Sequence, residues 1–389
     1  MIKDTSKQSW LANLPWVPVR AAMFDYAMTL AQVPARKFYW DAKIFTETIK
    51  EVFDYYGFDT ILTAADIYNH EVEALGAKLV YSDNAMPTID SREPLVKEPK
   101  DLLMLKTPDF YHDGRLPYSL DCTKLRAQYF GVYSGIFCGA ISLAVGLRSY
   151  PLLIRDMRKQ PSFAHELLTF VVDEVLVPFA KVQKEYCKVP RTVGADAWAS
   201  VPNLSVKDLK EWAVPYNQRL RTKAKEFGID AVTVSGEYCE ERPDQFNAEV
   251  MKGCLDVQVD SMGAPTLSLI QGRWHEYPLE PVREYTAKYR EQGTEVRVTA
   301  GVYARLLRDG PISEIVKTIK RFINTFARDH ELTIHLANIP FDTPPDHVHA
   351  AVAAVHTFGR KPIADNLDEI EFKPPKRESF QEWRKIKGI

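Results

Sequence analysis

Short runs of β-branched and apolar residues alternate along this chain with longer segments that carry an apolar residue every three or four positions. The short runs are typical of buried strands, and the longer segments of amphipathic helices. We predict strands at 57–66, 77–83, 131–141, 192–198, 231–234, 255–260, 294–301 and 332–336, with a further short one near 17–23. We predict helices at 38–56, 119–128, 163–186, 206–227, 243–253, 279–292 and 312–328, and a last helix whose first turn is Pro344-Pro345.

Strands that alternate with helices predict βα units and a parallel sheet. At least seven such units within 389 residues favour a closed (β/α)8 barrel, a TIM barrel, over an open doubly wound sheet. We expect a single domain, with the barrel at 38–358, an N-terminal lead-in at 1–37 and a charged extension at 359–389. The extension should run over the outside of the barrel, anchored by Phe380 and Trp383.

Acidic residues fall at the ends of several predicted strands, where barrel enzymes carry their chemistry. Asp66, Glu237 and Asp260 are the candidate catalytic acids, and Asp196 is a candidate for substrate contact. Carboxyl groups buried in a pocket can transfer protons or bind substrate. For each of them, a helix cap or a turn is the structural alternative.

The stretch 231–240 has the most specific chemistry. Glu237 and Cys239 are two residues apart, so an extended backbone would point both side chains the same way. A carboxylate and a thiolate that converge can bind zinc; a loop glutamate and a half-buried cysteine are the alternative. His335, on a predicted strand near this site, is a candidate third ligand.

Other polar residues near the strand ends could contact a substrate. Tyr68 and His70 lie two and four residues after Asp66, and a structural role is the favoured alternative for His70. Arg297 lies within a predicted strand, and a guanidinium that points into a barrel needs an anionic partner. It is therefore either a substrate clamp or the partner of a strand-end acid.

Composition narrows the classes of partner. The chain has 50 basic and 52 acidic residues, and a net charge of −2 does not favour binding to nucleic acid or to an anionic membrane. No stretch approaches the ~20 apolar residues of a transmembrane helix. The five cysteines form no C-x-x-C pair and the N-terminus lacks the apolar core of a signal peptide, so we expect reduced thiols and a cytoplasmic location.

A series of motifs extends from about residue 14 to residue 358. They include Trp16-Val-Pro-Val, Phe38-Tyr-Trp-Asp-Ala-Lys43, Gly135-Ile-Phe-Cys-Gly-Ala-Ile-Ser-Leu-Ala144, Gly194-Ala-Asp196 and Ile339-Pro-Phe-Asp-Thr-Pro-Pro345. With them, the chain resembles the uroporphyrinogen decarboxylase superfamily, and in particular its corrinoid-linked methyltransferases. The resemblance implies a (β/α)8 barrel, in agreement with the hydrophobic pattern. Decarboxylases of the family carry an Arg- and Gly-rich loop for tetrapyrrole carboxylates, but the corresponding stretch 19–26 here has one arginine.

The resemblance also bears on the metal site. Thiol-methylating members have a His-x-Cys-Gly zinc motif and a second cysteine, where this chain has Glu237-Tyr-Cys-Glu240 and Ala337. A metal with fewer thiolate ligands is harder and better suited to polarise an ether oxygen. The alternative is that no metal binds and a strand-end acid protonates the leaving oxygen.

The resemblance thus implies an O-demethylase methyltransferase, which moves a methyl group from an O-methyl donor to a Co(I) corrinoid. An aryl methyl ether is the first expectation for the donor. The corrinoid should come with a partner protein, because the chain lacks an Asp-x-His-x-x-Gly motif. The residues expected to contact the donor are Tyr26, Tyr68, His70, Asp196 and Arg297. A decarboxylase, or a non-catalytic barrel that binds a cofactor, remains an alternative, and the protein could form an oligomer.

Overall fold

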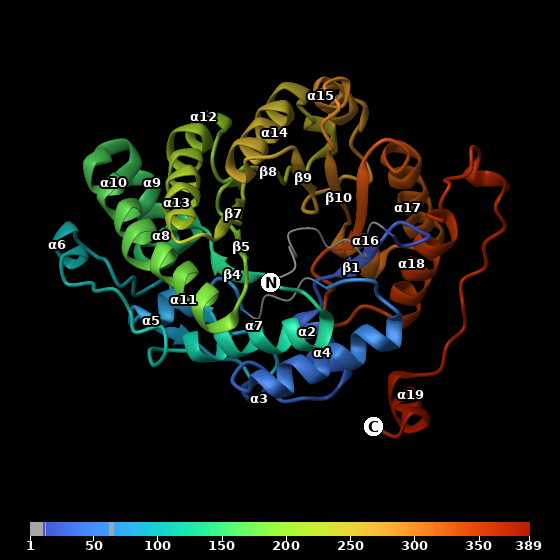
Figure 1. The fold of residues 1–389 in the computed structure, drawn as a ribbon, viewed down its shortest axis with the longest axis horizontal. Helices are drawn as coiled ribbons and strands as arrows, with labels where there is room; N and C mark the ends of the chain where they lie inside the picture. The colour runs from blue at the N-terminus through green and yellow to red at the C-terminus, as the bar shows by residue number, and fades with distance from the viewer. Residues whose placement is uncertain (1–10, 12, 62–65) are drawn as a thin grey trace.

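The computed structural model describes residue 11, residues 13–61 and residues 66–389. Helices surround a central ring of parallel strands, which is the predicted barrel architecture (Figure 1). The ring contains β1 (Val19–Ala21), β4 (Gly135–Cys138), β5 (Arg191–Ala195), β7 (Asp230–Val234), β9 (Thr266–Leu269), β10 (Arg297–Val302) and β11 (Glu331–Leu336). Of the ten residues of the predicted strand at 57–66, the four at 62–65 lie outside the described residues.

The described strands form two parallel sheets of the ring and two small pairs. The sheet orders are β1-β11-β10-β9 and β4-β5-β7. β2 (Leu79–Val80) pairs with β3 (Thr88–Ile89) in antiparallel fashion, and β6 (Ser200–Val201) pairs in parallel with β8 (Glu237–Tyr238). Each large sheet has its own hydrophobic core, formed with the helices that cover it.

The helices cover the outside of both sheets. In chain order they are α2 (Phe24–Leu30), α3 (Ala35–Phe38), α4 (Ala42–Tyr56), α5 (His70–Ala74), α6 (Pro99–Leu102), α7 (Leu116–Phe130), α8 (Ala140–Arg148), α9 (Tyr150–Lys159), α10 (Pro161–Phe170), α11 (Val177–Cys187), α12 (Val206–Asp208), α13 (Val214–Glu226), α14 (Ala248–Met262), α15 (Glu280–Glu291), α16 (Ala304–Asp309), α17 (Ile312–Phe326), α18 (Pro345–Phe358) and α19 (Phe380–Lys387). None of these helices in the described residues has the length and apolar character that crossing a membrane requires.

Two long helices tolerate a proline in their interior. Pro178 lies near the start of α11 and Pro215 near the start of α13, and each follows a π-helical segment, Val171–Leu176 and Leu209–Ala213. Proline has no N–H and its ring clashes with the preceding turn of an α-helix, so a wider turn just before it relieves the clash. The predicted helix at 163–186 is therefore confirmed as a continuous rod of α10, the π segment and α11.

One predicted strand is wrong. Residues 255–260 belong to α14, which begins after Asn247, whose side chain accepts hydrogen bonds from two N–H groups of the first turn. The alternating sequence Leu-Asp-Val-Gln-Val-Asp suggested a strand, but its buried members fit a helix. The buried positions of α14 include Met251, Cys254, Leu255, Gln258 and Ser261, at the three- and four-residue spacing of a helix face.

The predicted N-terminal boundary of the barrel is also wrong. β1 pairs in parallel with β11, with Val19 beside Ile334 and Arg20 beside His335. The barrel therefore begins well before residue 38. The short alternation at 17–23 was the correct signal, although so short a strand is stabilised only by its place in the sheet.

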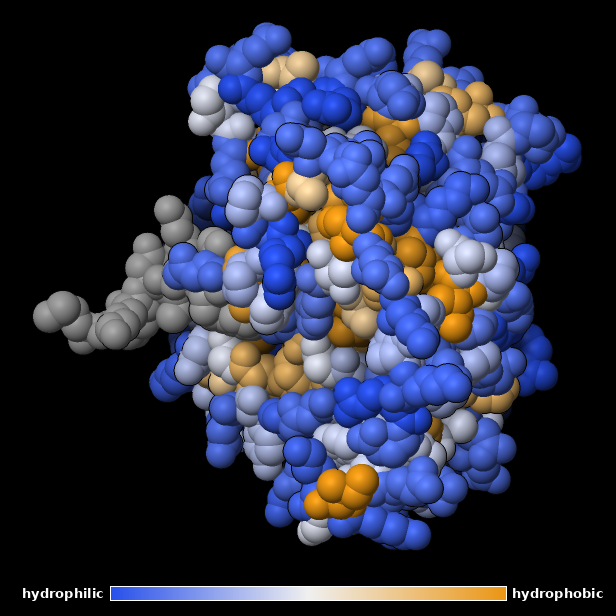
Figure 2. All heavy atoms as spheres, turned by 90° about the vertical axis from the view of Figure 1, so that its right-hand side faces the viewer, coloured by the Kyte–Doolittle hydropathy of each residue, from blue (hydrophilic) through white to orange (hydrophobic). Residues whose placement is uncertain are grey.

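The C-terminal extension passes over the outside of α17 and α18 (Figure 1). Apolar side chains lie among hydrophilic ones on this side of the molecule (Figure 2). The extension ends in α19, where Phe380 and Trp383 are buried and stack on one another. Both rings also contact Tyr55 of α4, so the predicted anchors are confirmed.

We expect Trp383→Ala to detach α19 from α4. The indole is 5% exposed, and removal of a buried tryptophan costs about 3 kcal/mol in free energy of unfolding. Urea denaturation followed by circular dichroism would measure the loss. Ile386→Ala is the matched control, since Ile386 lies on the same helix and is 73% exposed. Equal midpoints for the two variants would contradict an anchoring role.

Candidate functional site

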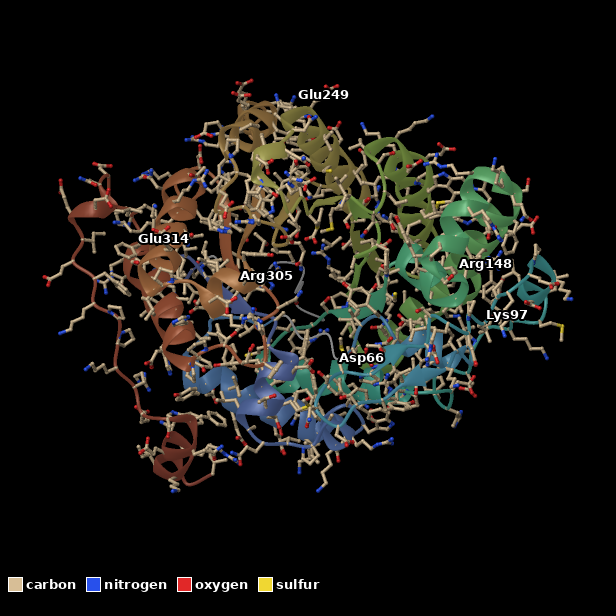
Figure 3. All side chains as sticks on the ribbon, turned by 180° about the vertical axis from the view of Figure 1, so that it is seen from behind. Asp66, Lys97, Arg148, Glu249, Arg305 and Glu314 are labelled. Atoms are coloured by element: carbon tan, nitrogen blue, oxygen red, sulfur yellow. The ribbon has the colours of Figure 1, made fainter. Side chains whose placement is uncertain are left out.

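Asp66 lies beside the centre of the barrel, whereas Arg148 and Glu249 lie on the surrounding helices (Figure 3). The backbone of Asp66 has a φ of 52°, an unfavourable conformation for a non-glycine residue, and the Asp66 side chain is fully buried. The carboxylate accepts hydrogen bonds from Arg115 Nη2 at 2.5 Å and from the amide of Asn69. Burial raises the pKa of Asp66 to about 7, against the opposing effect of the Arg115 charge.

Arg115 connects Asp66 to the molecular surface. Its Nε donates to Glu73 at 2.6 Å, and its guanidinium lies 4.6 Å from the centre of the Trp40 ring. The indole is partly exposed and packs against Tyr81. Asp66 therefore forms a buried ion pair with Arg115, which holds its carboxylate in place. The sequence patterns did not reveal Arg115 as a site residue.

Helix α5 follows this ion pair and contributes two more buried groups. Glu71 accepts a hydrogen bond from the backbone N–H of Cys138 at 2.8 Å, and burial raises its pKa to about 7. His70 is 1% exposed, its Nε2 has no hydrogen-bond partner, and its ring packs edge-on against Tyr118. Burial, together with the charge of Arg115, lowers the pKa of His70 well below its usual value, so the imidazole is neutral.

Asp196 ends β5 as predicted, and its oxygens are engaged within the protein. It accepts hydrogen bonds from the N–H groups of Ile141 and Ser142 at 3.1 and 2.8 Å, and from the Ser142 hydroxyl at 2.7 Å. These groups form the first turn of α8, so the carboxylate caps that helix. A Cβ at Gly139 would lie 2.3 Å from the Asp196 side chain, which is why a glycine is needed there. Asp196 therefore has the structural role of a helix cap, which was the alternative to substrate contact.

Glu237 and Cys239 lie just beyond β7, as expected. The strand ends at Val234, and Gly236, with a φ of 79°, turns the chain into β8. Glu237 accepts a hydrogen bond from the Ser268 hydroxyl at 2.6 Å, and burial raises its pKa to about 7. Burial, with the nearby Glu237 charge, also raises the pKa of the Cys239 thiol.

Tyr68 lies near several of the predicted site residues. Burial raises the pKa of its phenol, and so do the charges that Cys138, Glu237, Asp196 and Cys239 carry when ionised. The hydroxyl therefore lies within electrostatic reach of all four groups. At neutral pH Tyr68 and Cys239 keep their protons and Glu237 is about half protonated, so the cluster can donate protons and hydrogen bonds.

The opposite part of the ring contains an arginine, Arg20, that forms no ion pair with the described residues. Val19 and Ala21 pack against the helices, so Arg20, between them, points into the barrel. Its Nε is buried without a hydrogen-bond partner, and burial lowers its pKa to about 10, with no contribution from any acid in the described residues. Its neighbour His335 is 1% exposed, and its Nδ1 is likewise without a partner. The alternation at 17–23 could have singled out Arg20.

Small polar side chains line the wall between these two regions. Ser268, Thr299 and Thr333 lie side by side on β9, β10 and β11 and face inward. They are half-buried, although the outward-facing residues of the same strands are buried in the core. Since bulky residues fill the interior of a packed barrel, short hydroxyl side chains here leave the interior accessible.

Three predicted site residues lie elsewhere. Asp260 is exposed on α14, because the predicted strand is a helix. Arg297 begins β10 at the opposite end of the barrel, where its Nε donates to Glu331 at 2.8 Å on the surface. Tyr26 lies in the core between α2 and α4, with its hydroxyl bonded to that of Tyr56. The predicted catalytic role of Asp260 and the substrate-binding roles of Arg297 and Tyr26 are therefore wrong.

A family model described as uroporphyrinogen decarboxylase (URO-D) matches residues 11–358. The chain belongs to the uroporphyrinogen decarboxylase family. Among solved structures, this family member is similar to a methyltransferase from Methanosarcina mazei, with a TM-score of 0.70 and 17% sequence identity. The similarity covers 89% of this chain and 95% of that chain, and at this identity it establishes the fold. No curated protein sequence matches the chain.

The three candidate zinc ligands do not form one group, because His335 does not join Glu237 and Cys239. The described residues contain no group of three or more His, Cys, Asp and Glu side chains that could hold a metal ion. His335 lies beside Arg20, whose charge is among the causes that lower the pKa of the imidazole. A resident zinc ion needs three or four protein ligands, so Glu237 and Cys239 alone do not fit one.

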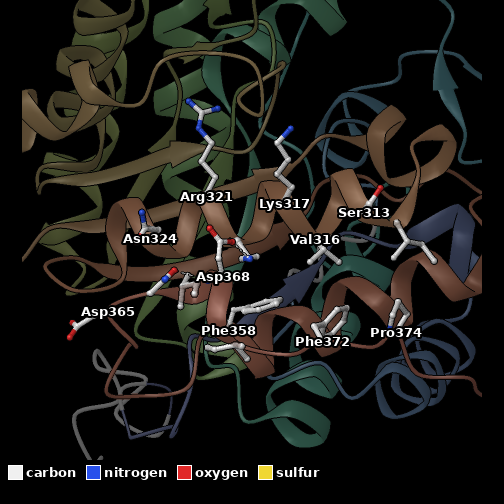
Figure 4. Close-up of a pocket in the computed structure, with 15 residues that line it drawn as sticks. Ser313, Val316, Lys317, Arg321, Asn324, Phe358, Asp365, Asp368, Phe372 and Pro374 are labelled. Atoms are coloured by element: carbon white, nitrogen blue, oxygen red, sulfur yellow. Dashed lines mark hydrogen bonds and ion pairs between the residues drawn. The ribbon is translucent and has the colours of Figure 1, made fainter.

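The groove between α17 and the C-terminal extension is separate from this site (Figure 4). It has a volume of about 860 Å³ and is lined by residues such as Val316, Phe358 and Phe372. It lies outside the barrel, and none of the buried acids described above lines it. The candidate site is therefore the barrel interior and not this groove.

We expect Glu237→Gln to change how stability depends on pH. The folded protein holds a proton on Glu237 up to about pH 7, but the unfolded chain releases it near pH ~4.3. Wild-type stability should therefore fall relative to the variant as pH rises between those values, by about 1 kcal/mol per pH unit. Urea titrations at pH 5, 6 and 7 would measure it. The exposed Glu211→Gln should track the wild type, and a wild-type curve parallel to that of Glu237→Gln would contradict the shift.

Proposed function

We propose that this protein is an O-demethylase methyltransferase, which moves the methyl group of an anionic aryl methyl ether to the reduced corrinoid of a partner protein. The observation that supports it most is that one barrel holds both an acid that keeps its proton and an arginine that forms no ion pair with the described residues. Glu237 is the acid and Arg20 the arginine. The fold shared with a methyltransferase from Methanosarcina mazei is consistent with this chemistry.

Glu237 is suited to protonate the leaving oxygen. The C–O bond of the ether breaks, its electron pair stays on the aryl oxygen, and that oxygen takes the proton of Glu237 and leaves as a phenol. The methyl carbon bonds to the Co(I) of the partner's corrinoid, which is the nucleophile. A carboxyl group with a pKa near 7 is close to optimal for this transfer at neutral pH.

Tyr68 and Cys239 lie within electrostatic reach of Glu237 and are neutral hydrogen-bond donors. Their raised pKa values mean that neither carries a charge that would repel the developing aryl oxide. A buried donor aimed at a developing negative charge contributes more than one in water. Their role is to orient the ether oxygen toward Glu237.

Arg20 is suited to bind an anionic substituent of the ring. β9, which holds Ser268 beside Glu237, is three strand spacings from β1, or ~14 Å along the curved wall. An aromatic donor that spans the barrel interior would meet Glu237 at one end and Arg20 at the other. A carboxylate at the far end of the ring would pair with the guanidinium of Arg20, whose buried Nε has no partner among the described residues.

A decarboxylase is the second candidate, because Asp66 and Arg20 also suit an acidic substrate. One assay separates the two. The purified protein is mixed with a Co(I) corrinoid protein and methoxybenzoate, and both the methylated-corrinoid spectrum and carbon dioxide are recorded. Transfer of methyl supports the proposal. Carbon dioxide release without corrinoid would establish the decarboxylase instead, and no methyl transfer from any O-, N- or S-methyl donor would refute the proposal.

In that assay we expect Glu237→Gln to lower the rate at least 100-fold, which is the usual contribution of a general acid. The wild-type rate should fall as pH rises through about 7, because Glu237 then loses its proton. The exposed Glu211→Gln should behave as wild type. A rate that rises with pH across this range would show that Glu237 acts as a base or has no role.

We expect Arg20→Met to raise KM for methoxybenzoate about 100-fold, since a charge-assisted hydrogen bond contributes about 2–3 kcal/mol. KM for neutral guaiacol should change little, because that donor has no carboxylate. Arg297→Met is the matched control, as Arg297 pairs with Glu331 at the other end of the barrel. Equal effects of Arg20→Met on both donors would exclude an anion-binding role.

A further inference from the structure

Between β7 and β9 the described strands are not joined by a backbone ladder, although both lie in the same ring. We call this interval the seam. An unpaired N–H or C=O group inside a protein costs about 1–3 kcal/mol, so the edge of β9 needs other partners. The side chain of Gln258, on α14 and 2% exposed, provides them.

The Gln258 amide spans the seam. Its Oε1 accepts from the N–H of Ser268 at 2.6 Å, and its Nε2 donates to the carbonyls of Ser268 and Gly236 at 3.1 and 3.2 Å. It thereby takes the place of a neighbouring strand for Ser268. Gly236 directly precedes Glu237, and the Ser268 hydroxyl donates to the Glu237 carboxyl. One amide thus holds both the backbone that carries the acid and the residue that binds its oxygen.

The other large sheet contains a second amide of the same kind. Gln183 on α11 accepts from the N–H of Ile136 on β4 at 2.8 Å and donates to its carbonyl at 2.9 Å. Each glutamine, on a covering helix, hydrogen-bonds both the N–H and the carbonyl of one strand residue. Only Gln258 is also connected to a candidate catalytic group.

We propose that Gln258 is a positioning residue for Glu237, which acts through Ser268 and Gly236 to hold the carboxyl at one wall of the barrel interior. This role rests on the proposed function of Glu237 as the acid. The hydrogen bond from Ser268 stabilises the ionised carboxylate and so lowers the pKa of Glu237, against the larger raising effect of burial. Loss of the Gln258 amide frees Ser268 to move and weakens that hydrogen bond.

The proton on Glu237 can be followed without any methyl donor. The carboxyl band of Glu237, identified by its absence in Glu237→Gln, is titrated by infrared difference spectroscopy in the full-length protein. Ser268→Ala should raise its midpoint by about one pH unit, and Ser268→Thr, which keeps the hydroxyl, should restore it. Gln258→Met, of equal length but without hydrogen bonds, should raise the midpoint by about half a unit or more. In a plot of methyl-transfer rate against pH, the fall on the alkaline side should move to higher pH in the same variants.

Gln183→Met is the matched control, because it loses the same kind of amide at the other sheet. It should lower the thermal midpoint as Gln258→Met does, but leave the Glu237 titration unchanged. If Gln258→Met does not fold, Gln258→Asn, one methylene too short to span the seam, is expected to give the same titration shift. The positioning role would be overturned if the Glu237 midpoint in the Gln258 variants equalled that of the wild type, or if Gln183→Met shifted this midpoint equally. Absence of methyl transfer by the wild type, with the infrared shift intact, would overturn the proposed function alone.

Discussion

The backbone groups of buried strands must all find hydrogen-bond partners, and this constraint shapes the barrel. Where strands lie side by side, the parallel ladders of the two sheets satisfy it. At Ile136 of β4 and Ser268 of β9, helix side chains also do so, through Gln183 and Gln258. The covering helices are therefore part of the hydrogen-bonded ring as well as of the two hydrophobic cores.

Burial determines the charge state of Glu71, Glu237 and Arg20. Burial raises the pKa values of Glu71 and Glu237 to about 7, and no cation is among the causes of either shift. Arg20 keeps its charge, because even a lowered guanidinium pKa stays well above neutral pH. The interior thus has proton donors at one side and a cation at the other, which favours a ligand that gains a proton at one end and carries negative charge at the other.

The candidate site also explains why membership of the uroporphyrinogen decarboxylase family does not by itself determine the reaction. The family model covers the whole barrel, but a barrel can host many chemistries through its strand ends. Asp66 is held in a buried ion pair with Arg115, and Asp196 is committed to the cap of α8. Of the strand-end acids considered, Glu237 is the one whose carboxyl is held by a single hydroxyl and is free to exchange a proton.

The sequence by itself determined the barrel, the strand before Glu237 and the juxtaposition of Glu237 with Cys239, because these depend on local periodicity and on the alternation of side chains along a strand. It misplaced Asp260, since an alternating run of six residues is compatible with either a strand or a helix, and only packing of α14 on the sheet selects the helix. The partners of Glu237 and the isolation of Arg20 were decided by the tertiary structure, because Ser268 and Gln258 come from other elements and burial depends on the whole ring.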